Sequence, residues 1–225
     1  MQIEPVAIIY NDFTDKFAIP RQSGIAEKTK SRIEFIPPYN KTKAVKNIDE
    51  FSHLWLIWEF SHNIREKQEL TVRPPRLGGN KRVGVFASRS PYRPNNLGLS
   101  SVRLDNVLTE NDTPILIVSG ADIMNGTPIY DIKPYIPFSD CHTDANGGYI
   151  DNNDFNTLKV DINEIFLNQF SSEQAEILCS ILSNDPRPAY HRDNNRIYGF
   201  SFAHKEIKCR VENDTISVVS INDEK

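Results

Sequence analysis

Cysteine is scarce in this chain of 225 residues, which contains only Cys141, Cys179 and Cys209. Their odd number, their wide spacing and the absence of a C-x-x-C pair argue against a disulfide framework and a zinc site. The chain also has no apolar run near the roughly 20 residues that a membrane span needs. Its first residues lack the basic and apolar regions of a signal peptide. These absences predict a cytoplasmic protein without a metal and without a membrane segment.

Several motifs of catalysis and nucleotide binding are missing as well. The chain has no G-x-G-x-x-G or G-x-x-x-x-G-K-[ST] sequence, so a Rossmann turn or a P-loop is not supported. It has neither an H-E-x-x-H pair nor a G-x-S-x-G nucleophile turn. His142 follows Cys141 directly, and adjacent residues of an extended segment point to opposite faces, which argues against a Cys–His pair. A hydrolase acting on a small anion therefore has no nucleophile in its favour.

Acidic residues are absent from one stretch, Thr71–Ser100, although the whole chain has a net charge of −4. This basic segment contains prolines, which exclude a helix interior, and glycines, which allow tight turns. Within it, the apolar run Val83–Ala87 predicts one short buried strand. The segment is suited to an anionic partner such as RNA, although loops that merely solvate a barrel rim would have the same composition. Its basic residues are Arg73, Arg76, Lys81, Arg82, Arg89 and Arg93.

The rest of the N-terminal part reads as short strands separated by proline, glycine and asparagine turns. Such spacing is typical of an all-β barrel or sandwich up to about residue 140. Ala44–Phe51 is predicted to form a short helix or turn, and His53 and His62 lie at the two rims of the most apolar strand. The predicted strands are Val6–Tyr10, Arg32–Ile36, Phe51–Phe60, Ser101–Val107 and Pro114–Val118.

The last third of the chain combines one helix with strands. Cys141–Asn156 is rich in Asn, Asp and Gly and is predicted to be a linker. Ser171 can cap an amphipathic helix that ends near Leu182. We therefore predict a mainly β protein with an N-terminal β-barrel domain, residues 1–143, and a small C-terminal α+β domain, residues 157–225. The predicted C-terminal strands are Leu158–Ile162, Arg196–Phe202, Ile207–Val211 and Thr215–Ile221, the last two forming a hairpin.

Specific runs within this pattern resemble the TsaA-like (TrmO) family of tRNA methyltransferases, which have a β-barrel S-adenosylmethionine domain. The longest is RPPR-x-GG…GVFASRSPYRPN in the basic segment, and the resemblance extends over nearly the whole chain. One departure is Asn96, where the family usually has proline, and we expect it to loosen that turn slightly. The other matching runs are Ala18–Gly24, Phe51–Trp55, Asn125–Tyr135 and Asp185–Tyr190.

The resemblance implies methyl transfer from S-adenosylmethionine to N6 of N6-threonylcarbamoyladenosine at tRNA position 37, by a homodimer with the cofactor near the subunit interface. Arg89 could pair with the carboxylate of the cofactor. The alternative is a non-catalytic RNA-binding β-barrel that has lost methyl transfer. Carried over by motif, the cofactor-binding residues would be Gln22, Ser23, Gly24, Ser61, His62, Arg89, Leu99, Ala121, Asp122, Ile123 and Met124.

The catalytic candidates are Asp131, Lys133 and Tyr135. Asp131 would accept or orient the N6 proton, and the other two would position the substrate; that this turn only braces the barrel stays open. Methyl transfer needs close in-line placement more than a covalent catalyst. Residues of the basic segment would hold phosphates or the threonyl carboxylate, and the DPRPAY turn would stack on the base. These substrate candidates are Arg73, Arg76, Arg93, Arg187 and Tyr190.

Overall fold

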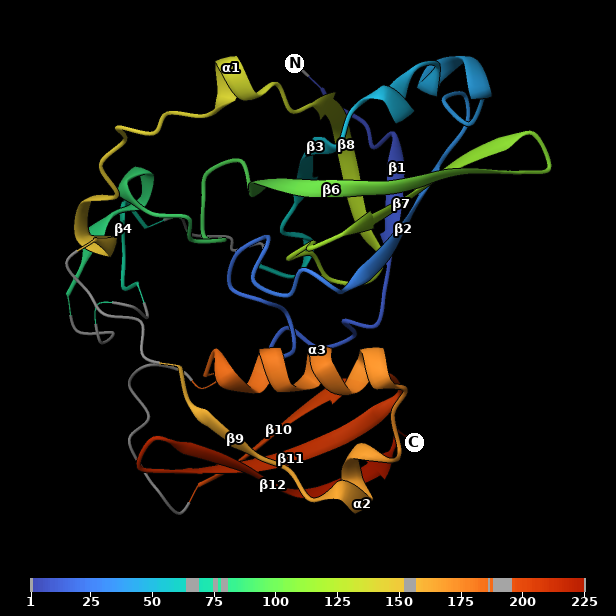
Figure 1. Cartoon of the computed structure of the whole chain (residues 1–225). Helices are drawn as coiled ribbons and strands as arrows, with labels where there is room; N and C mark the ends of the chain where they lie inside the picture. The colour runs from blue at the N-terminus through green and yellow to red at the C-terminus, as the bar shows by residue number, and fades with distance from the viewer. Residues whose placement is uncertain are drawn as a thin grey trace.

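Six antiparallel strands close into a barrel in the order β1-β2-β7-β6-β3-β8 (Figure 1). This computed structural model describes residues 2–63, 69–74, 77, 81–151, 157–185, 187 and 196–224. The prediction of a mainly β fold with an N-terminal barrel is confirmed. The barrel strands are β1 (Ala7–Tyr10), β2 (Lys30–Phe35), β3 (His53–Glu59), β6 (Leu97–Glu110), β7 (Thr113–Ser119) and β8 (Thr127–Pro134).

Strand β3 shows how the sequence pattern builds the barrel. Leu54, Leu56 and Trp58 alternate with partly exposed residues and are buried in the barrel core. Because side chains of a strand alternate between its two faces, the period of two places this set inside and Trp55 and Ile57 outside. Hydrogen bonds to β6 on one side and β8 on the other make β3 the central strand of this wall.

Two predicted elements differ in detail. Val83–Ala87 is not one strand: β5 (Val83–Gly84) pairs with β4 (Thr71–Val72), and the chain then turns into a 3-10 helix, Val85–Ala87. The turn forms because the carbonyl of Val85 accepts a hydrogen bond from the Ser88 hydroxyl at 2.9 Å, which an extended strand would not allow. The predicted short helix or turn before β3 consists of two 3-10 helices, Thr42–Val45 and Ile48–Glu50.

The C-terminal part is a four-stranded sheet covered by one long helix. Helix α3 (Ser172–Ser183) begins with the expected serine cap, a full capping box between Ser171 and Gln174. The predicted hairpin of the last two strands is confirmed. The sheet has the order β10-β11-β12-β9, formed by β9 (Lys159–Asp161), β10 (Ile197–Phe202), β11 (Lys205–Glu212) and β12 (Thr215–Asp223). Short helices are α1 (Pro137–Asp140), α2 (Glu164–Leu167) and the 3-10 helices Ser61–Asn63 and Gly148–Ile150.

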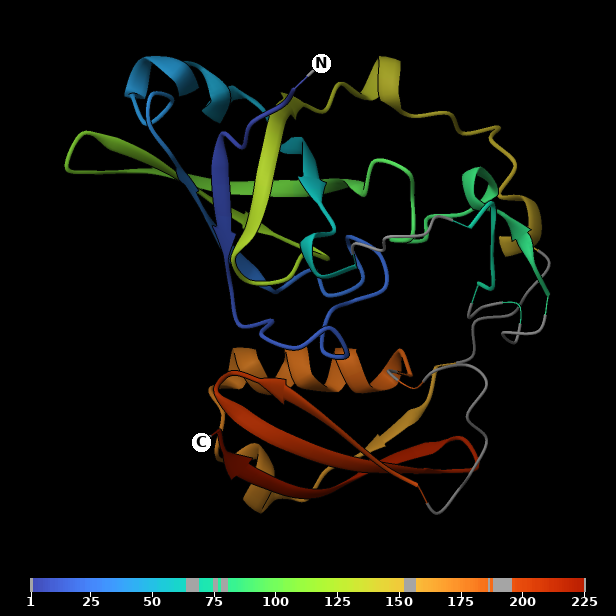
Figure 2. The same cartoon turned by 180° about the vertical axis from the view of Figure 1, so that it is seen from behind.

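Both views place α3 between this sheet and the barrel (Figures 1 and 2). The loop between β1 and β2 reaches the same place, since its Phe13 and Ala18 are fully buried in the core of the C-terminal unit. Phe13 lies 6.3 Å from Phe202, centroid to centroid. The core of the C-terminal unit is therefore completed by residues from the N-terminal part of the chain.

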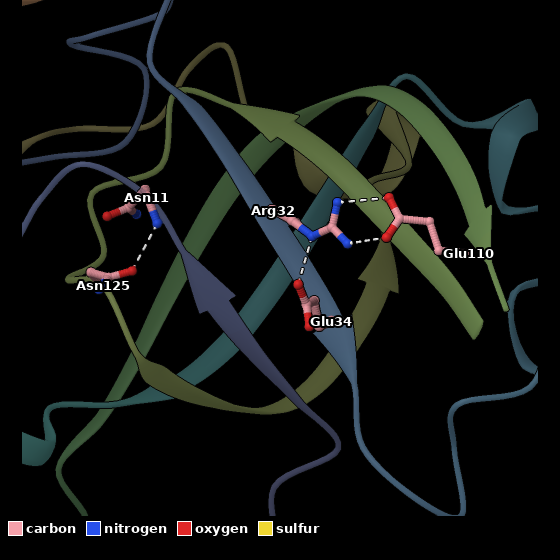
Figure 3. Close-up of polar contacts among 5 residues, drawn as sticks. All are labelled: Asn11, Arg32, Glu34, Glu110 and Asn125. Atoms are coloured by element: carbon pink, nitrogen blue, oxygen red, sulfur yellow. Dashed lines mark hydrogen bonds and ion pairs between the residues drawn. The ribbon is translucent and has the colours of Figure 1, made fainter. Parts of the chain in front are cut away.

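Polar contacts brace the barrel near this loop (Figure 3). The backbone N–H of Asn11 donates to Asn125 Oδ1 at 3.0 Å, and its side-chain amide donates to the Ile123 carbonyl at 2.9 Å. On the outer surface the Arg32 guanidinium donates two hydrogen bonds to the Glu110 carboxylate, at 3.0 and 2.7 Å. The Arg32 pair is exposed and contributes little to stability, whereas the asparagine contacts fix the segment that follows β7.

Candidate functional site

A chain of hydrogen bonds leads from the barrel core to the segment after β7. The Trp58 indole N–H donates to the Ser100 hydroxyl at 2.9 Å, and that hydroxyl donates to Asp122 Oδ1 at 2.5 Å. Burial raises the pKa of the Asp122 carboxyl, and hydrogen bonds from Ser100 and from the Ser23 backbone, together with the charge of Arg89, oppose the rise. The barrel thus holds a partly buried carboxyl group whose ionised form a nearby cation would stabilise.

The loop segment 21–24 lies directly against this carboxyl group. Gly24 N–H donates to the Gly120 carbonyl at 2.9 Å, and both glycines have positive φ, +81° and +78°. Gln22 Oε1 accepts a hydrogen bond from Arg89 Nη1 at 2.5 Å. The loop segment 21–24, the segment after β7 and Arg89 of the basic segment therefore meet around Asp122.

The turn that carries Arg89 is held by its own polar groups. Arg93 Nη1 donates to the Ser88 carbonyl at 2.6 Å and to the Val85 carbonyl at 3.4 Å. Asn96 donates through its side chain to the Pro91 carbonyl at 3.2 Å and has a φ of +48°, which the proline of the family could not adopt. Asn96 therefore adds a hydrogen bond across the turn, where a slight loosening was expected.

The catalytic candidates lie on the outer face of the barrel. Cross-strand pairing places Asp131 beside Ile57 and Ile57 beside Leu99, so these three share one face of the wall. Asp131 Oδ2 forms an ion pair with Lys133 Nζ at 3.3 Å, and Tyr135 packs on Trp55 at 5.4 Å between ring centroids. Leu99 thus lies with the catalytic candidates, on the opposite face of β6 from the Ser100 side chain.

Comparison with known proteins accounts for both parts of the chain. The tRNA-methyltransferase O N-terminal domain matches residues 8–141, and the TrmO C-terminal domain matches residues 156–224. The chain belongs to the tRNA-methyltransferase O family. This membership covers the barrel and the helix-covered sheet alike.

Two bacterial relatives are similar along most of their length. The tRNA (adenine(37)-N6)-methyltransferase of Escherichia coli is 38% identical over 197 residues, which are 85% of this chain and 84% of that protein. A candidate S-adenosylmethionine-dependent methyltransferase of Pseudomonas aeruginosa is 38% identical over 205 residues, 88% of this chain and 87% of its own. The crystal structure of TrmO from P. aeruginosa superposes with a TM-score of 0.78 and 29% identity, covering 99% of this chain and 97% of that one.

Within this member of the TrmO family, the cofactor candidates fall into two groups. Gln22, Ser23, Gly24, Arg89 and the segment 121–124 meet around the Asp122 carboxyl group, where Ala121 and Ile123 are fully buried. The second group comprises Leu99 on the outer face and the 3-10 helix that begins at Ser61. Just before this helix, the backbone N–H of Phe60 donates to the Asn96 carbonyl at 2.8 Å. The side chain of His62 lies outside the described residues. The binding roles stay predictions.

The substrate candidates are not gathered in one place. Arg73 is exposed after β4, whereas the Arg93 guanidinium is engaged by the turn described above. The Arg187 guanidinium donates two hydrogen bonds to the Asp185 carboxylate, at 2.8 and 2.9 Å. These hydrogen bonds raise the pKa of Arg187. Arg76 and Tyr190 lie outside the described residues. Arg93 and Arg187 therefore serve internal contacts, and their roles toward substrate stay predictions.

Sequence reasoning missed three residues that shape the site. Ser100 is a polar residue at an inward position of β6, between the buried Gly98 and Val102, and that mismatch with the apolar pattern was the available signal. Trp58 was included only as part of the predicted strand Phe51–Phe60. Arg21 was passed over because its partners are backbone carbonyls of a distant turn, which no sequence pattern marks.

None of the helices in the described part of the chain is both long and apolar enough to cross a membrane. No three His, Cys, Asp or Glu side chains among the described residues gather closely enough to hold a metal ion.

Proposed function

We propose that this protein is an S-adenosylmethionine-dependent tRNA methyltransferase that methylates N6 of N6-threonylcarbamoyladenosine at position 37. The match of both parts of the chain to the TrmO family carries the proposal. It is supported by the name of the E. coli relative, which is similar over most of both chains.

The residues around Asp122 fit the cofactor. S-adenosylmethionine presents two cationic groups, the sulfonium and the α-amino group, and one carboxylate, and when bound it supplies an electrophilic methyl group. The partly buried Asp122 carboxyl group suits a cation, and the exposed Arg89 guanidinium beside it suits the carboxylate. Gly24 and Gly120 have no side chains, which lets these two segments approach closely beside Asp122. We assign the remaining cofactor candidates to the same ligand.

On the substrate side, Asp131 would take or orient the N6 proton. Its side chain is 50% exposed and is paired with a 62% exposed Lys133, so the carboxyl group is within reach of a substrate N–H. The N–H of the substrate belongs to a urea-like group and is more acidic than that of a plain amine, so a weak base suffices. Lys133 and Tyr135 would position the base, and Arg73, Arg76, Arg93, Arg187 and Tyr190 would contact the tRNA.

The proposal includes a homodimer in the cytoplasm. Leu99 is 60% exposed and Phe86 is 77% exposed, and both belong to the segment that leads into and along the outer face of β6. A second copy covering these apolar side chains would also enclose the face that carries Asp131. The two proposed domains, 1–143 and 157–225, would act within each subunit.

Mass spectrometry of the nucleoside at position 37 tests the function. The full chain is incubated with S-adenosylmethionine and tRNA that carries the threonylcarbamoyl group, and unmodified tRNA serves as the control substrate. We expect one added methyl group on the modified adenosine alone. An unchanged mass, with tRNA binding but no heat of cofactor binding in calorimetry, would instead support the non-catalytic RNA-binding barrel.

Arg89→Ala should weaken cofactor binding by roughly tenfold or more, because a charge-assisted hydrogen bond to a carboxylate is lost. Calorimetry with S-adenosylmethionine measures this change. Arg82→Ala is the matched control, since Arg82 is a neighbouring arginine already paired with Glu69 at 2.5 Å. Equal affinities of the two variants would remove Arg89 from the cofactor site.

A further inference from the structure

Arg21 connects the β1–β2 loop to the C-terminal unit. A single guanidinium nitrogen, Nη2, donates to the Asp185 carbonyl at 2.6 Å and to the Arg187 carbonyl at 2.8 Å. Both carbonyls follow the end of α3, where the helix dipole places partial negative charge. A cation with two N–H groups on one nitrogen is suited to hold both carbonyls at once.

The two residues that accept from Arg21, Asp185 and Arg187, are also bonded to each other. Asp185 has a φ of +52°, in the left-handed region that non-glycine residues rarely adopt. Its carboxylate accepts from the Arg187 backbone at 3.2 Å and from the Arg187 guanidinium at 2.8 and 2.9 Å. An unusual backbone conformation persists only where the surroundings determine it fully, and Arg21 supplies the contacts from outside the C-terminal unit.

The residues that follow Arg21 belong to the proposed cofactor site. Gln22 bonds to Arg89, the Ser23 backbone bonds to the Asp122 carboxyl group, and Gly24 bonds to Gly120. Four consecutive residues thus connect Asp185 and Arg187 with the segments that meet around Asp122. Two other contacts of this loop involve α3 itself: the Ser180 hydroxyl donates to the Ile25 carbonyl at 3.3 Å, and Lys28 pairs with Glu176 at the solvent surface, with side chains 66% and 56% exposed.

We propose that Arg21 is a positioning residue that fixes Asp185 and Arg187 relative to the cofactor loop, so that tRNA held by the C-terminal unit meets the methyl donor in the correct orientation. This inference rests on the proposed function. Arg21 contacts neither ligand in the proposal. Its loss should therefore affect how substrate is presented and not how the cofactor binds, because Gln22, Ser23 and Arg89 stay in place.

The test compares Arg21→Ala, Arg21→Lys and the control Lys28→Ala in the full chain. Hydrogen exchange of the peptide covering residues 182–187 should become faster in Arg21→Ala, while β11 and β12 exchange as in the wild type. KM for modified tRNA should rise by about tenfold, the effect of one or two lost charge-assisted hydrogen bonds. Calorimetry should give an unchanged affinity for S-adenosylmethionine. Arg21→Lys should restore most of the protection and of KM, because an ammonium can also donate to both carbonyls.

Three results would overturn the inference. They are unchanged exchange at 182–187, a KM equal to that of Lys28→Ala, and a loss of cofactor affinity by the same factor as the loss in KM. Failure of the proposed function looks different, since wild-type protein would then leave modified tRNA unmethylated. The exchange measurement still decides in that case whether Arg21 fixes Asp185 and Arg187.

Discussion

Asp122→Asn should bind S-adenosylmethionine more weakly than the wild type and yet unfold with a larger free energy. Burial raises the pKa of this carboxyl group, which means that the folded protein disfavours its ionised form. A neutral amide of the same shape removes that cost, but it no longer attracts a cation. We expect the affinity to fall roughly ten- to hundredfold, as when a charge-assisted contact is lost. Calorimetry gives the affinity and denaturant unfolding gives the stability.

The pH dependence of this effect has a defined sign. The folded-state pKa of Asp122 is raised above its unfolded value, so the folded state binds more protons at intermediate pH. The wild type should therefore be less stable than Asp122→Asn at neutral pH. The difference in free energy of unfolding between the wild type and Asp122→Asn should become smaller as the pH falls through the raised pKa, since the carboxyl group of the folded protein then becomes neutral.

Asp112→Asn is the matched control for this pair of measurements. Asp112 is exposed at the tip of the β6–β7 hairpin and has a φ of +61°, which asparagine also tolerates. It should change neither the cofactor affinity nor the stability. A loss of stability in Asp122→Asn that matches the loss of affinity would show that Asp122 is a structural residue of the barrel.

The alternation of apolar residues was enough to predict most of the sheet. Along β3 it identifies the inward residues Leu54, Leu56 and Trp58, and in the last third it identifies the β11–β12 hairpin. These elements depend on local periodicity, which tertiary contacts reinforce. Val83–Ala87 was misjudged because a five-residue apolar run has no such period, and side-chain bonds to the Val85 carbonyl decide its course.

The site was less accessible to prediction because it depends on closure of the barrel. Which residues are near Asp122 follows from strand order, and only the folded chain brings Ser23, Ser100 and Arg89 to one carboxyl group. Composition also cannot tell an arginine that is free to bind from one that holds its own turn. Arg93 and Arg187 both looked available in the sequence, and both donate to groups of their own loops.

Gly98→Ala should be the most destabilising single-methyl substitution in the barrel wall. A Cβ at this position would lie within 3.0 Å of three atoms of the Trp58 ring, closer than real Cβ atoms come to other atoms. That ring cannot retreat easily, because it is 6% exposed, packs on Phe60 at 4.3 Å and donates to Ser100. Overpacking of this kind costs about 1–3 kcal/mol. A lower denaturant midpoint and altered tryptophan fluorescence would report it.

Gly84→Ala separates this clash from the general effect of replacing a glycine. Gly84 also lies in a β-strand, has a φ of −59°, and a Cβ there would meet nothing within 4 Å. The free energy of unfolding of Gly84→Ala should stay close to that of the wild type.

Trp58→Leu should partly rescue the stability of Gly98→Ala, since the smaller side chain leaves room for the methyl group. A double-mutant cycle would then show favourable coupling between the two positions. Additive effects would mean that Gly98 is required for a reason other than the approach of Trp58.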